Sequence, residues 1–132
     1  MAQWHLRSRR KPSGKLLKKI SKKKKYQRGR DFLPTHIGEP KSQSLSARGG
    51  NVKRLLLRTN VANVTVKGKS QKAKILSVIG NTADSQFIRR NIITKGAILQ
   101  TDIGKVKVTS RPGQSGVVNA IIVEEKDVQK KG

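Results

Sequence analysis

The sequence predicts an all-β fold, in which a small barrel or sandwich of about six short strands follows a long, basic and largely irregular N-terminal extension. Two observations carry this prediction. Most of the valine and isoleucine lies after Asn51, in short runs separated by turn signals at intervals of about ten residues. In contrast, residues 1–30 hold thirteen lysines and arginines and no acidic residue. A chain of 132 residues suits one domain with such an extension.

The basic extension cannot join a compact core, because each buried lysine or arginine would need a partner or water. Its charge is densest in residues 18–25. Blocks of like charge stay extended until an anion neutralises them, so we expect the extension to become ordered on binding. Leu16, Leu17 and Ile20 have the spacing of one helix face, which allows a short helix around residues 15–26. Repulsion between the clustered lysines opposes that helix. The alternative interpretation is a solvated tail without a function.

Residues 31–50 are predicted to connect the extension to the β domain. Pro34, Gly38 and Pro40 interrupt any regular pattern there, and serines add polarity. Residues 48–51, with two adjacent glycines, end the connector. We interpret them as a turn before the first strand; the alternative is a backbone that a phosphate approaches closely.

The β pattern begins at Val52 and predicts a hairpin. Three leucines at 55–57 open the first extended segment, and valines continue it to Val66. Residues 67–70 are a turn signal, and apolar residues return between 73 and 79. Two extended segments joined by a tight turn form a hairpin.

A loop and two short extended segments follow the hairpin. Asp84 or Ser85 is expected to cap a single helical turn that runs through Arg89. Extended segments are predicted at residues 92–93 and 97–99, with a glycine between them.

The last two strands are predicted from alternation. Val106 and Val108 alternate with lysines, which indicates a half-buried strand with a basic outer face. A long turn then leads to a final strand at residues 117–123. The alternation predicts that Val108 and Val118 face inward, while Asn119 faces outward.

The composition indicates a polyanionic partner. The net charge is +24 and the sequence pI is about 11.5, so nucleic acid is the first candidate and an anionic membrane surface the second. The absence of cysteine excludes disulfides and zinc ribbons. No apolar run has the length of about 18 residues that spans a bilayer, and no apolar stretch of a secretory signal follows the basic N-terminus. The four aromatic residues are too few for an RNA-stacking sheet.

Residues with catalytic or metal-binding chemistry are scarce and scattered. His5 and His36 lie far apart and lack the convergent ligands of a metal site. Glu124 and Glu125 are neighbours on an extended chain, so they point to opposite faces and cannot form a catalytic pair. Residues 68–70 resemble the end of a P-loop but lack its upstream glycine and its helix. We therefore expect no catalytic residue, no metal, no cofactor and no small-molecule substrate.

Several runs of sequence are together similar to one protein family. They are Trp4 with RSRRKPSGK at 7–15, NVANV at 60–64, RNIITKGA at 90–97, VTSRPGQ at 108–114 and GVVNA at 116–120. In this order they resemble the small-subunit ribosomal protein 8e family of archaea and eukaryotes, over nearly the whole chain and at the length of the short archaeal form. The resemblance implies a six-stranded β-barrel with an N-terminal extension. It also implies a cytoplasmic protein of the ribosome, bound to ribosomal RNA of the small subunit and adjacent to other ribosomal proteins.

The residues predicted to bind RNA lie in the extension and on the barrel. Lysine and arginine displace counterions from phosphates, and arginine adds bidentate contacts that lysine cannot make. Trp4 and Tyr26 are expected either to stack on unpaired bases or to pack against the barrel. The predicted RNA-binding residues are Trp4, Arg7, Arg9, Arg10, Lys11, Lys15, Lys18, Lys19, Lys22, Lys23, Lys24, Lys25, Tyr26, Arg28, Arg30, Arg48, Arg89, Arg90, Lys95 and Arg111.

We expect three parts: a basic RNA-binding extension with its connector at 1–47, a β-barrel domain at 48–127 and a frayed tail at 128–132. The predicted function is that of a structural constituent of the small ribosomal subunit, which stabilises ribosomal RNA through a basic arm and a basic barrel face. The alternatives are a general nucleic-acid-binding or DNA-compacting protein and a membrane-surface protein. The extension has too small an apolar face to favour the membrane.

Overall fold

The computed structural model describes residues 3–18 and 21–123 and divides the chain into two compact units, Met1–Phe32 and Leu33–Gly132. In the first unit, the described residues form one 3-10 turn, η1 (Lys25–Gln27), and two isolated antiparallel bridges. Apart from η1, the described part of residues 15–26 does not form the short helix that the sequence allows. Repulsion between neighbouring lysines accounts for that, because like charges three or four residues apart destabilise a helix.

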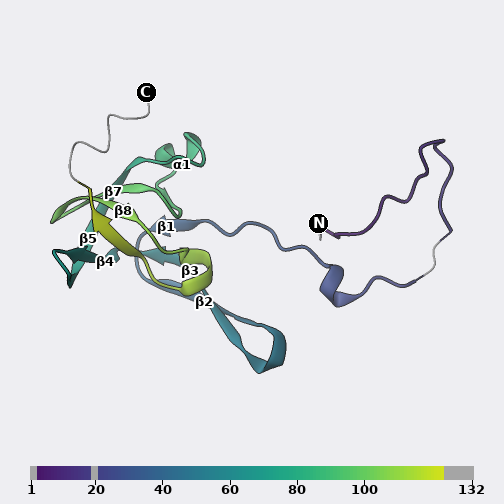
Figure 1. Ribbon diagram of the computed structural model, residues 1–132, viewed down its shortest axis with the longest axis horizontal. Coiled ribbons are helices and arrows are strands. Elements are labelled where there is room, and N and C mark those ends of the chain that lie inside the picture. The colour runs from purple at the N-terminus through teal and green to yellow at the C-terminus, as the bar shows by residue number, and fades with distance from the viewer. Residues whose placement is uncertain (1–2, 19–20, 124–132) are drawn as a thin grey trace. The chain divides into compact units, whose positions relative to one another are not determined.

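The second unit is built mostly from strands (Figure 1). Its described strands are β1 (Thr35–Ile37), β2 (Lys41–Ser46), β3 (Val52–Thr59), β4 (Val61–Val66), β5 (Lys69–Gly80), β6 (Ile92–Ile93), β7 (Ile98–Thr101), β8 (Gly104–Val108) and β9 (Asn119–Ile122). Three single turns accompany them: η2 (Arg48–Gly50), α1 (Gln86–Arg89) and α2 (Pro112–Ser115). The predicted all-β class is therefore confirmed.

Five strands close the barrel, in the order β4-β5-β7-β8-β9. Neighbours run antiparallel, except that β4 and β9 pair in parallel and close the ring. The predicted hairpin is confirmed for β4 and β5, which are joined at Lys67 and Gly68. Its first segment, predicted as continuous to Val66, is divided at Asn60, and the part before Asn60 is β3 of another sheet. The expectation of six barrel strands is wrong by one, because the segment at 92–93 pairs with β1 as β6 instead of entering the ring.

The second unit also contains a four-stranded sheet, in the order β2-β3-β1-β6. β1 lies between β3, which is parallel to it, and β6, which is antiparallel. The structure thus places two strands in the segment predicted as a connector. These strands were not predicted because apolar residues do not alternate in this segment. A side-chain hydrogen bond helps to hold β1 in place: Thr35 Oγ1 donates a buried hydrogen bond of 2.6 Å to the carbonyl oxygen of Leu56.

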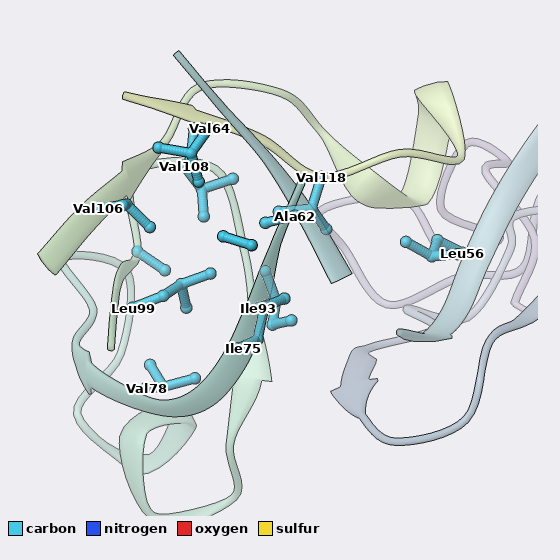
Figure 2. Close-up of a cluster of buried hydrophobic side chains, with 13 residues drawn as sticks. Leu56, Ala62, Val64, Ile75, Val78, Ile93, Leu99, Val106, Val108 and Val118 are labelled. Atoms are coloured by element: carbon cyan, nitrogen blue, oxygen red, sulfur yellow. The ribbon is translucent and has the colours of Figure 1, made fainter. Parts of the chain in front are cut away.

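The barrel interior is filled by aliphatic side chains from alternate strand positions. Val64, Leu99 and Val106 are each 0% exposed, and they lie among the inward-facing side chains in Figure 2. Val108 and Val118 are buried as well, which confirms their predicted orientation. Figure 2 shows Leu56, which comes from β3, to one side of the barrel residues.

The two short helices are fixed at their ends. Of the two predicted capping candidates, Ser85 occupies the N-cap position of α1 without a side-chain hydrogen bond, whereas Asp84 Oδ1 accepts a 2.9 Å hydrogen bond from the backbone N–H of Gln86. Pro112 begins α2, and Gly116 ends it in the left-handed conformation with φ of 72°. A Cβ on Gly116 would lie 2.8 Å from the Cβ of Arg54, so only glycine lets α2 pack this closely on β3.

Candidate nucleic-acid interface

The arginine-rich end of the first unit is a tight loop. The backbone N–H of Leu17 donates to the carbonyl of Arg9, and that of Lys11 donates to the carbonyl of Lys15. Gly14 turns the chain with φ of 80°. Arg10 closes the loop from its side chain, because its Nη1 donates a 2.9 Å hydrogen bond to the carbonyl of Gly14. The loop presents a cluster of exposed cations on a short piece of ordered backbone.

The two ends of the first unit lie side by side. Trp4 pairs with Arg28 in an antiparallel bridge, and the N–H of Gly29 donates a 2.6 Å hydrogen bond to the carbonyl of Gln3. The ammonium of Lys23 lies 5.0 Å from the centroid of the Trp4 ring, a cation–π distance. One face of the Trp4 ring is therefore covered by a lysine, whereas Tyr26 is 75% exposed and available for stacking.

The predicted cations of the second unit lie at turns. Arg48 occupies the tip of the β2–β3 hairpin, which projects from the barrel in Figure 1. Arg89 ends α1 with Arg90 after it, Lys95 lies between β6 and β7, and Arg111 precedes α2. Each of these five side chains is exposed, on a turn whose backbone is held by hydrogen bonds or by strand ends.

Exposure is common to the predicted set. Among the described members, Trp4 is half-buried and every other residue is exposed. Lys19 lies outside the described residues. Within residues 3–18 and 21–123, none of the predicted cations forms a salt bridge with a carboxylate. The positive charges of the described members are therefore not neutralised by carboxylates within the described residues.

Sequence reasoning missed a further group of cations on the β2–β3 hairpin, namely Lys41, Lys53, Arg54 and Arg58. All four are exposed, and the Nζ of Lys53 donates a 3.4 Å hydrogen bond to Gln114 Oε1 near the end of α2. The signal that could have found them is charge: no acidic residue occurs between Glu39 and Asp84. That run covers the hairpin and the whole of the first two barrel strands, β4 and β5.

The described part of the chain has neither a metal-binding cluster nor a membrane-spanning helix. No group of three or more histidine, cysteine, aspartate or glutamate residues there is arranged to hold a metal ion. No helix within it is long and apolar enough to cross a membrane.

Comparison with known proteins identifies the family. The family model described as "Ribosomal protein S8e" matches residues 4–123. The protein named "Small ribosomal subunit protein eS8" of Methanococcus aeolicus is 49% identical over 128 residues, which cover 95% of this chain and 100% of that protein. Its namesake in Methanococcoides burtonii is 47% identical over 124 residues, 92% of this chain and 99% of that protein. Because the match spans nearly the full length of both the chain and its relatives, the chain belongs to the ribosomal protein S8e family.

Proposed function

We propose that this chain is a structural component of the small ribosomal subunit in the cytoplasm, where it binds ribosomal RNA and touches neighbouring ribosomal proteins. Membership of the S8e family supports a structural role in the ribosome rather than an enzymatic one. The observation that carries RNA binding is the charge of the extension: residues 1–30 hold thirteen lysines and arginines, and those that the structure describes are exposed.

The extension binds mainly through electrostatics. Each lysine or arginine that meets a phosphate releases condensed counterions, so affinity falls steeply as salt rises. Arg7, Arg9 and Arg10 add planar guanidinium groups that grip a phosphate with two hydrogen bonds or stack on a base. The lysines at 22–25 supply charge with little geometric selectivity. The two groups therefore differ in role: arginines select a site and lysines hold it.

The tip of the β2–β3 hairpin is a second contact. Gly49 and Gly50 have φ of 65° and 75°, a conformation that residues with a Cβ rarely adopt. A Cβ built on Gly50 meets nothing within 4 Å, so the tip is open to solvent. A phosphate can approach this bare backbone while Arg48 neutralises its charge. This supports the second of the two interpretations made for residues 48–51.

Co-sedimentation tests the proposal. The full-length protein, mixed with small ribosomal subunits stripped of it, should remain with the subunits after a high-salt wash. An equal mass of duplex DNA should not displace it, because a ribosomal site adds geometry to charge. Loss of the protein to the competing DNA would contradict a ribosomal role and favour the DNA-compacting alternative.

A further inference from the structure

The structure brings together two asparagines that the proposed arm contacts do not use. β4 and β9 pair in parallel with Asn63 opposite Asn119, and Asn63 Nδ2 donates a 3.2 Å hydrogen bond to Asn119 Oδ1. The next residues, Val64 and Ala120, are buried in the core, so both amides stand on the outer wall of the barrel. Asparagine is depleted in strands because its side chain competes for backbone hydrogen bonds. Strand stability alone does not explain such a pair.

Cations and hydroxyl groups surround the pair. In the register of the sheet, Lys72 of β5 lies opposite Asn63, and Lys107 of β8 lies opposite Ile121 of β9. No acidic residue occurs in β4, β5, β8 or β9. We call this surface the asparagine wall; it consists of Val61, Asn63, Thr65, Ser70, Lys72, Lys107, Asn119 and Ile121.

The hydrogen-bonding capacity of the pair is matched to a hydroxyl. Their mutual bond uses the oxygen of Asn119 and one N–H of Asn63. It leaves the Asn63 oxygen as an acceptor and the Asn119 amide nitrogen as a donor, and neither has another partner within the described residues. The ribose 2′-hydroxyl of RNA both donates and accepts a hydrogen bond, and DNA lacks it.

The shape and charge of the wall agree with an RNA helix. An A-form helix has a wide, shallow minor groove lined with 2′-hydroxyl groups, and the convex side of a narrow barrel fits such a surface. Lys72 comes from β5, the neighbour of β4, and Lys107 comes from β8, the neighbour of β9, so each lysine lies one strand beyond one of the asparagines. They therefore flank the amides on both sides, where they meet phosphates. Val61 and Ile121 are 39% and 45% exposed and lose contact with water when the groove is occupied.

We propose that the asparagine wall binds the minor groove of an RNA helix, with Asn63 and Asn119 hydrogen-bonded to ribose 2′-hydroxyl groups and Lys72 and Lys107 on flanking phosphates. The inference rests on the proposed function, since it assumes that the partner is RNA. It adds that a double-stranded segment is contacted by the barrel itself, and that this contact distinguishes RNA from DNA.

Competitive filter binding of the full-length chain tests the proposal with two probes, an RNA duplex and a DNA duplex of the same sequence. The wild type should prefer the RNA duplex. The double variant Asn63→Ala/Asn119→Ala should lose about tenfold in affinity for RNA, the effect of two neutral hydrogen bonds, and should bind DNA as the wild type does. Gln71→Ala is the matched control, because it removes an exposed amide from β5 next to Lys72 and should change neither affinity.

A second variant separates charge from hydroxyl recognition. The double variant Lys72→Gln/Lys107→Gln should weaken the binding of both duplexes and reduce the magnitude of the log–log slope of affinity against salt by about one to two. The ratio of RNA affinity to DNA affinity should stay that of the wild type. A wild type without preference for RNA, or an asparagine variant that melts normally and keeps the wild-type ratio, would overturn the inference. Failure of the wild type to bind either duplex or ribosomal RNA would instead overturn the proposed function.

Discussion

Replacement of Val118 by aspartate probes the register of the closing barrel strand. Val118 is 2% exposed, and its carbonyl accepts a 2.8 Å hydrogen bond from the backbone N–H of Asn63. The change removes about 2 kcal/mol of apolar burial and places a carboxylate without a partner in the core. Substitutions of that kind cost about 4–5 kcal/mol or more, against a stability of about 5–15 kcal/mol for a small domain. The cost matches the lower end of that stability, so the barrel should be strongly destabilised and partly unfolded at neutral pH.

The neighbouring Val117 supplies the matched control, since it is 43% exposed. Val117→Asp should change stability by no more than about 0.5 kcal/mol. Urea unfolding followed by circular dichroism measures both variants. A buried carboxyl has a folded-state pKa raised above its unfolded value of about 4. The penalty of Val118→Asp should therefore be smallest below that pH and grow as the pH rises. A Val118→Asp variant as stable as Val117→Asp at pH 7 would refute the inward orientation.

Two further predictions concern the domain division and the arginines. Limited trypsin digestion of the free protein should cut first within residues 7–30. The stable fragment should retain β1, because β1 is paired with strands on both sides. A stable fragment that begins at Arg48 would show instead that β1 and β2 are dispensable, as the predicted domain boundary at 47/48 implies. Replacement of Arg7, Arg9 and Arg10 by lysine keeps the charge but removes the planar fork. In filter binding this triple variant should keep the wild-type salt slope and lose selectivity for small-subunit ribosomal RNA over bulk RNA; unchanged selectivity would show that these arginines act as charge alone.

The fold was predictable where burial follows alternation. Val106 and Val108 are two residues apart, as are Val118 and Ala120 at the next strand, and this period of two places all four in the core as observed. β2 was missed because its residues are mostly polar and exposed, and β1 because it has only three residues; both are held by pairing with β3. The number of strands in the barrel also could not be predicted from local sequence. β6 is apolar like the barrel strands, but it pairs with β1 and so belongs to the other sheet.

The candidate site was predictable as far as charge allows. The basic extension and the cations at the turns were predictable from the positions of lysine and arginine in the sequence, because a basic residue without a partner stays on the surface. The asparagine wall does not, since Asn63 and Asn119 are 56 residues apart and meet only through the parallel pairing of β4 and β9. Contacts made by non-local strand pairing leave no mark in a linear pattern. The cation of Lys23 over Trp4 is hidden for the same reason.

The salt dependence of binding, measured with and without residues 1–30, tests most directly the claim that the extension is the main RNA-binding element. If about eight of its thirteen charges meet phosphates, its share of the log–log slope is roughly −6 to −7. A rise from about 50 to 200 mM salt then weakens that share about 10⁴-fold. Deletion of residues 1–30 should remove most affinity for small-subunit ribosomal RNA, flatten the slope and leave the thermal melt of the barrel nearly unchanged. A truncated protein that binds this RNA as tightly as the full chain, with the same slope, would contradict the claim.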